Sequence, residues 1–149
     1  MQKIVIGADH RGYSLKEQIK KLLSNNFNVI DAGAFSAEPS DYPDIAREVV
    51  KYMKSGKCEK GILICGSGVG ASVSANKFKG IRAAVCHDSF SAHQGVEDDD
   101  MNLLCLGGGI IGPSLAAEII TVFLKAKFKG EERFVRRLNK VLKIEEENS

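Results

Sequence analysis

The 149-residue sequence has no long apolar run, no concentration of one charge sign and no cysteine pair with CxxC spacing. No apolar stretch approaches the ~20 residues that a membrane-spanning helix needs, so we expect no membrane partner. The net charge is only +2, with 21 basic and 19 acidic residues spread along the chain. Because a nucleic-acid surface normally shows a concentrated basic stripe, we do not expect nucleic acid as a partner either.

The cysteines, at positions 58, 65, 86 and 105, lack the short spacing of a structural zinc site. We therefore expect no metal, and free thiols in a reducing cytosol rather than disulfides. The N-terminal segment MQKIVIGADH enters a strand pattern directly and lacks the basic-then-apolar form of a signal peptide. These features predict a cytoplasmic protein.

Short β-rich runs alternate with segments of helical periodicity along the whole chain. We predict strands at residues 3–8, 27–31, 62–64, 81–86 and 102–106. Helices are predicted at residues 15–23, 45–53, 71–76, 88–96 and 113–124, followed by a basic helix at 131–143 and a frayed end at 145–149. This alternation predicts one α/β domain over residues 1–149, with a five-stranded parallel sheet, helices on both faces and a doubly wound order.

In open α/β sheets, ligands bind beyond the carboxyl ends of the strands. These ends carry Asp9-His10, Cys65-Gly66-Ser67, Cys86-His87 and Gly107-Gly108-Gly109. Residues that are far apart in the sequence should therefore meet at one edge of the sheet.

Residues 61–76 read GILICGSGVGASVSAN, which indicates a buried strand, a tight turn and a helix N-terminus. Such a turn exposes backbone N–H groups that attract anions. It lacks the Lys-Ser/Thr ending of a Walker P-loop and the spacing of a dinucleotide fingerprint. Two interpretations of Cys65 stay open: an inert core thiol, or a base whose thiolate is stabilised at the helix N-terminus.

Other candidate residues also have two interpretations. Asp9 and His10 pair a carboxylate with an imidazole, or cap a helix and face solvent. Arg133 and Arg137 are four residues apart and project from one helix face, where they hold a phosphate or are simply solvated. The run from Asp98 to Asp100 is more typical of a solvated loop than of a metal site.

Four segments appear in a specific order: GADHRGYSLK, DYPDIA, CGSGVGASVSANKFKGIRAA and NLLCLGGGIIG. Over residues 3 to about 142, this arrangement resembles the ribose-5-phosphate isomerase B family, which includes the galactose-6-phosphate isomerase subunits. The resemblance implies a Rossmann-like parallel sheet and a homodimer, or dimer of dimers, with composite active sites. It also implies aldose–ketose isomerisation of a small sugar phosphate without a cofactor, with ribose 5-phosphate and ribulose 5-phosphate of the pentose phosphate pathway as the expected pair.

The resemblance further implies roles for individual residues. Cys65 matches the base that moves a proton between C1 and C2. Ser67 matches part of the anion hole for the enediolate, together with the N–H groups of Gly66, Gly68, Val69 and Gly70. The residues that match substrate ligands are Asp9, His10, Asp41, Tyr42, Arg133 and Arg137, the arginines reaching the phosphate in a partner's site.

The sequence departs from the family pattern at three positions. Asp98 and Asp99 stand where the family commonly has a ring-opening His and its neighbouring Asn. Ring opening would then fall to His10, His87 or His93, or use Asp98. Gly109 stands where relatives often have a phosphate-binding Arg. Two alternatives therefore stay open: a six-carbon (allose or galactose 6-phosphate) isomerase, and a sugar-phosphate-binding protein without catalysis.

Overall fold

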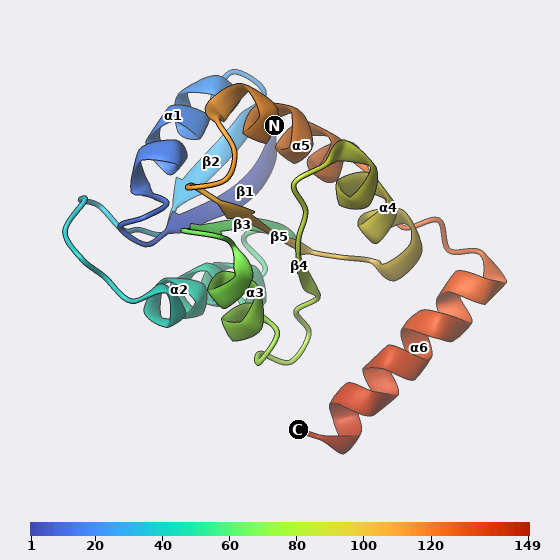
Figure 1. Ribbon diagram of the computed structural model, residues 1–149. Coiled ribbons are helices and arrows are strands. Elements are labelled where there is room, and N and C mark those ends of the chain that lie inside the picture. Colours follow the sequence, from blue (N-terminus) through green and yellow to red (C-terminus); the bar gives the residue numbers. More distant parts are fainter.

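The computed structural model describes all 149 residues and contains one five-stranded sheet with helices around it (Figure 1). The strands are β1 (Gln2–Ala8), β2 (Phe27–Asp31), β3 (Lys60–Cys65), β4 (Ala83–Val85) and β5 (Leu103–Gly107). Every neighbouring pair runs parallel, in the order β2-β1-β3-β5-β4. The predicted fold class, a Rossmann-like parallel sheet, is confirmed.

The helices are α1 (Tyr13–Leu23), α2 (Tyr42–Lys54), α3 (Val69–Ala75), α4 (Ser89–Asp99), α5 (Pro113–Lys125) and α6 (Glu132–Glu147). One core joins α1, α4 and α5 to one face of the sheet, and a second core joins α2 and α3 to the other. Successive strand residues alternate between these cores: Ile4 and Ile6 face the first, and Val5 faces the second. Burial on both faces explains why the central strands are continuous apolar runs.

The strand register brings the predicted edge together. Ala8 pairs with Ile64 and Cys65 pairs with Gly107, so β1, β3 and β5 end side by side. The polar residues that follow these strands therefore lie near one another, as expected for the carboxyl ends of parallel strands.

The edge strand β4 is shorter than the predicted 81–86 segment. The N–H of Arg82 donates to the side chain of Asn102 at 2.8 Å instead of extending the ladder. The side-chain amide of Asn76 pairs with both backbone groups of Ala83, at 2.8 and 2.9 Å. Side chains thus replace backbone partners at the start of β4 and limit its length.

The C-terminal helix α6 continues beyond its predicted end, to Glu147, so the prediction that residues 145–149 fray is wrong for the first three of them. The carboxylate of Glu145 accepts from the N–H of Gly80 at 3.0 Å, and Glu146 pairs with Lys79. These contacts tie the last turn to the segment before β4. Most of α6 nevertheless stands away from the sheet (Figure 1), and Phe134 is its one buried residue.

The helices of this chain are short or amphipathic, and none combines the length and the hydropathy needed to span a membrane.

Candidate functional site

A cavity of about 610 Å³ opens at the carboxyl ends of β1 and β3. Its walls come from the segment after β1, the start of α2 and the glycine turn that leads into α3. The lining residues are Asp9, His10, Arg11, Ser40, Asp41, Tyr42, Cys65, Gly66, Ser67, Val69, Gly70 and Val73. Residues as far apart in the sequence as Asp9 and Val73 thus form one site, as the topology predicts.

Cys65 ends β3 and lies on the α2–α3 side of the sheet, where it lines the cavity although only 4% of it is exposed. Its Sγ accepts a hydrogen bond from the N–H of Gly68 at 3.2 Å. That geometry depends on Gly68, whose φ of 84° is a left-handed conformation that a side chain would disfavour. The turn therefore folds back on the sulfur.

Several backbone N–H groups of the glycine turn have no hydrogen-bond acceptor in the protein. Within it, the N–H of Gly68 is used by Cys65 and the N–H of Val69 by the hydroxyl of Ser67. The N–H groups of Gly66, Ser67 and Gly70 donate to no acceptor in the protein. Free N–H groups grouped in one turn form a site for negatively charged oxygen.

Two backbone hydrogen bonds from the loop that follows β5 fix the glycine turn. The N–H of Gly108 donates to the carbonyl of Cys65 at 2.7 Å, and that of Gly109 donates to the carbonyl of Gly66 at 3.0 Å. Because its carbonyls are fixed, the turn presents its donors in a defined arrangement.

Tyr42 packs directly on the turn from the start of α2. A β-carbon added at Gly70 would lie 2.6 Å from Cζ of the Tyr42 ring, which is closer than real β-carbons approach. Glycine at this position is therefore required for the close approach of the ring to the turn.

Asp9 is buried, and its carboxylate accepts from the N–H groups of Arg11 and Gly12 at 2.9 and 3.1 Å. It thus fixes the turn that precedes α1, and it also lines the cavity. The two roles are compatible because one oxygen, Oδ1, accepts both bonds. The interpretation of Asp9 as the N-cap of this helix is wrong, because Gly12 occupies the N-cap position.

His10 is held against Ser40, on the other wall. The N–H of His10 donates to Oγ of Ser40, and the ring Nδ1 lies 3.1 Å from both the N and the O of Ser40. Since Nδ1 is occupied in either tautomer, Nε2 is the ring nitrogen that remains for a ligand.

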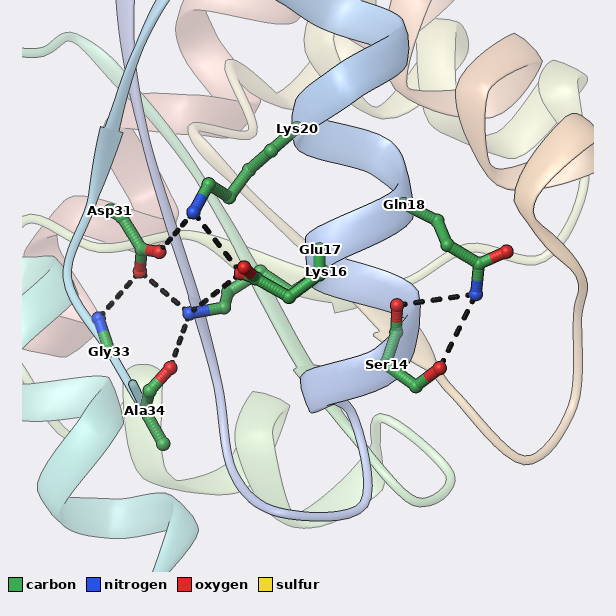
Figure 2. A network of polar contacts seen from close by, with 8 residues as sticks. All are labelled: Ser14, Lys16, Glu17, Gln18, Lys20, Asp31, Gly33 and Ala34. Carbon is green, nitrogen blue, oxygen red and sulfur yellow. Dashed lines mark hydrogen bonds and ion pairs between the residues drawn. The ribbon is translucent and has the colours of Figure 1, made fainter. Parts of the chain in front are cut away.

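A buried ion pair supports the loop that carries Ser40 (Figure 2). Lys16 is completely buried, and its Nζ lies 2.7 Å from Asp31 Oδ1 and also donates to the carbonyl of Ala34. Burial opposes the charge on Asp31, but hydrogen bonds from Lys16 and Lys20 outweigh it and lower the pKa of the carboxyl. The hydrogen bond to Asp31 likewise raises the pKa of Lys20.

This network continues into the cavity wall. Asp31 also accepts from the N–H of Gly33 at 2.9 Å, and Gly33 and Ala34 exchange backbone hydrogen bonds with Ala8. Ala8 is the last residue of β1 and precedes Asp9. Lys16 thus fixes the turn after β2 relative to the strand end from which the site residues emerge.

Five of the predicted site residues do not line the cavity of their own chain. Gly68 lies within the glycine turn, where its N–H is taken by Cys65, and the other four are Asp98, Asp99, Arg133 and Arg137. Asp98 and Asp99 end α4 and precede β5, so they lie at the amino edge of the sheet, whereas Cys65 ends its strand at the carboxyl edge. One strand of five residues separates these edges by about 16 Å. Asp98 accepts instead from Gln94 at 2.7 Å, and Asp99 lines a groove beside α6.

The two arginines project from α6. Arg133 pairs with Glu131 at 3.0 Å and lies 4.5 Å from the centre of the Phe134 ring. Arg137, one turn further along, is exposed and forms no ion pair.

Of the three histidines considered for ring opening, only His10 lines the cavity. His87 accepts from the N–H of Gly107 through Nε2 at 2.9 Å, and His93 pairs with Glu97 at 2.8 Å. The structure contains no group of three His, Cys, Asp or Glu side chains placed to hold a metal ion.

The sequence interpretation missed Arg11, Ser40 and Val73, all of which line the cavity. Two of them had a signal nearby: Arg11 directly follows His10, and Ser40 directly precedes Asp41. Val73 lies one turn after Val69 on α3, where helical spacing could have indicated it.

Comparison with known proteins finds relatives along nearly the whole chain. The family model described as Ribose/Galactose Isomerase matches residues 4–141. Ribose-5-phosphate isomerase B of Escherichia coli is 41% identical over 147 residues, which cover 98% of each chain. D-erythrulose-4-phosphate isomerase of Pectobacterium atrosepticum is 41% identical over 135 residues, which cover 87% of each chain. The solved structure of Clostridium thermocellum ribose-5-phosphate isomerase B superposes with a TM-score of 0.95 at 45% identity, covering 99% of this chain and 100% of that one.

Proposed function

The chain belongs to the ribose/galactose isomerase family, and we propose that it interconverts ribose 5-phosphate and ribulose 5-phosphate. The observation that carries this proposal is Cys65, which lines the cavity beside backbone donors that have no protein acceptor. A base and an oxyanion site in one cavity are what the transfer of a proton next to a carbonyl requires.

In the proposed reaction, the thiolate of Cys65 removes the proton from C2 of the open-chain aldose. The electron pair of the C–H bond forms the C1–C2 double bond, and the carbonyl electrons move to O1. The protonated thiol then returns the proton to C1 while the proton of the 2-hydroxyl group moves to O1, which gives the ketose. The N–H of Gly68 donates to Sγ and holds the sulfur beside the turn, and the N–H groups of Gly66, Ser67 and Gly70 stabilise the enediolate oxygen.

The remaining cavity residues bind and open the sugar. Asp9, Asp41 and Tyr42 face the cavity beside the turn and are placed to accept or donate to sugar hydroxyls. His10 has Nε2 available, so we assign it the proton transfer that opens the furanose ring.

We further propose that the working form is a homodimer, in which a second copy supplies Asp98, Asp99, Arg133 and Arg137 to the cavity. In their own chain these residues lie away from it. The projecting helix α6 supports this arrangement, since Val135, Val141, Leu142 and Ile144 are apolar and exposed along it.

The relatives of this chain are named for sugar phosphates of different length. The chain is equally identical to relatives named for a five-carbon and for a four-carbon substrate. We favour the five-carbon sugar because the match to the ribose-5-phosphate isomerase covers 98% of both chains, against 87% for the erythrulose-4-phosphate enzyme. Comparing kcat/KM for ribose 5-phosphate, D-erythrulose 4-phosphate and allose 6-phosphate would decide between them.

The test of the mechanism is isomerisation of ribulose 5-phosphate in D₂O, followed by NMR. Proton abstraction by a base that exchanges with solvent incorporates deuterium at C2 of the ribose 5-phosphate formed. Cys65→Ala should lower kcat by about 10³-fold, within the usual range for a removed acid–base group. Cys58→Ala, which removes a buried thiol outside the cavity, is the matched control. Full activity of Cys65→Ala would eliminate Cys65 as the base.

A further inference from the structure

Arg11 is the only lysine or arginine among the residues that line the cavity. Its guanidinium group lies against the backbone of Gly66, the first residue of the glycine turn. A β-carbon added at Gly66 would overlap Cζ, Nη1 and Nε of Arg11. The absence of a side chain at position 66 therefore leaves the space that this cation occupies.

The backbone of Arg11 is fixed while its charged end is free. Its N–H donates to the buried carboxylate of Asp9 at 2.9 Å. On the other side, the turn after β5 packs so closely that a β-carbon at Gly108 would lie 2.6 Å from the carbonyl oxygen of Arg11. The guanidinium itself forms no ion pair and no hydrogen bond, so all five of its N–H donors are available.

The lining of the cavity carries more acidic than basic side chains. Asp9 and Asp41 bring two carboxylates to the lining, and no other arginine or lysine is present to offset them. A phosphate dianion entering such a cavity would be repelled unless a cation lay on its path. The arginines of α6 lie outside this cavity.

We propose that Arg11 binds the phosphate group of the substrate; this inference rests on the proposed sugar-phosphate isomerase function. The planar guanidinium matches two phosphate oxygens at once, which an N–H of the turn cannot do. Arg11 is exposed, whereas Cys65 lies at the buried floor. The phosphate at Arg11 would therefore occupy the outer part of the cavity while the reacting carbons lie over Cys65 and the free N–H groups of the turn.

The test separates binding of phosphate from catalysis. Arg11→Ala should raise KM for ribose 5-phosphate by about tenfold, the effect of one lost charge-assisted hydrogen-bonded contact, and change kcat by less than about twofold. Binding of inorganic phosphate, measured by calorimetry, should weaken by a similar factor. Arg11→Lys, which keeps the charge but loses the two-oxygen contact, should fall between the two proteins.

Arg47→Ala is the matched control, since Arg47 is an exposed arginine on α2 that lies over Phe78 and outside the cavity. It should leave KM and phosphate binding unchanged. A lower kcat with unchanged KM in Arg11→Ala would place Arg11 at the reacting carbons and overturn the proposal, as would unchanged values for both. If the unmodified protein isomerises no sugar phosphate but binds inorganic phosphate in a manner that Arg11→Ala weakens, the proposed function fails and the assignment of Arg11 stands.

Discussion

The polar residues of the cavity are held differently from those of a second region, the arm. The arm is formed by the end of α4 and by α6. In the cavity, Asp9 and Cys65 are buried and fixed by backbone hydrogen bonds. On the arm, Arg133 and Arg137 are exposed and have at most a surface partner. This chain by itself holds the polar residues of the cavity in place, whereas those of the arm are exposed for contact with another surface.

The largest effect should come from the ion pair that supports the cavity wall. Lys16→Met would leave Asp31 with one partner fewer, and we expect it to lower the free energy of unfolding by about 3 kcal/mol, as for other broken buried pairs. Urea denaturation measures this. Lys20→Met is the matched control: Lys20 also lies 2.7 Å from Asp31 but is partly exposed and does not contact Ala34. Equal losses in the two variants would contradict the role given to burial.

The pH dependence of the same pair sharpens the comparison. The pKa of Asp31 is lowered in the folded protein, so its contribution to stability is present above the ordinary value of 3.8 and is lost as the pH falls below it. Acid titration followed by circular dichroism should show unfolding at a higher pH in Lys16→Met than in the parent protein. An unchanged acid transition would mean that Asp31 does not depend on Lys16.

The buried thiol of Cys86, which lies outside the cavity, predicts how the stability of the protein falls at alkaline pH. Burial raises the pKa of Cys86 to about 11, from an ordinary value of 9.0. Since the unfolded chain loses this proton first, stability should fall as the pH rises from 9 to 11, by at most about 2–3 kcal/mol. In Cys86→Ala the decline over this pH range should be smaller, as measured by urea denaturation at several pH values. The same slope in both proteins would assign the decline to other groups.

The contact between Tyr42 and the glycine turn predicts a catalytic effect. Gly70→Ala should displace the Tyr42 ring, because the new β-carbon would overlap it, and lower kcat/KM by about tenfold. Gly112→Ala removes a glycine that lies outside the cavity, has open space around it and has a negative φ of −92°, and so controls for the loss of backbone freedom. If a crystal structure of Gly70→Ala showed Tyr42 in its original position, the glycine turn would have moved instead and the prediction would be wrong.

The smallest effect is expected on the arm. Arg137→Ala removes an exposed side chain without an ion pair, so thermal stability should not change. If a second copy brings Arg137 to the phosphate, KM for ribose 5-phosphate should still rise about three- to tenfold. Arg136→Ala, its neighbour on the helix, serves as the control. An unchanged KM in Arg137→Ala would confine the site to the residues of the cavity.

Much of the molecule follows from local sequence patterns. The apolar runs and helical periodicity predicted every strand and helix, and the order of the elements predicted that Asp9, Cys65 and Gly107 meet at one edge. The ends of the strands and helices were less predictable, because contacts with residues that are distant in the sequence determine them. Asn76 and Asn102 shorten β4, and Gly80 and Lys79 hold the last turn of α6.

The sequence by itself determined the parallel sheet, the turn after β3 and the cysteine placed there, since periodicity, glycines and strand ends are local properties. Only the tertiary structure decided that Lys16 is buried against Asp31, and that Arg11 lies across Gly66. It also decided that Asp98 and Arg133 lie away from Cys65 in the same chain. The physical reason is that burial, charge pairing and distance depend on which segments pack together, and packing between distant segments is not encoded in any single stretch of the chain.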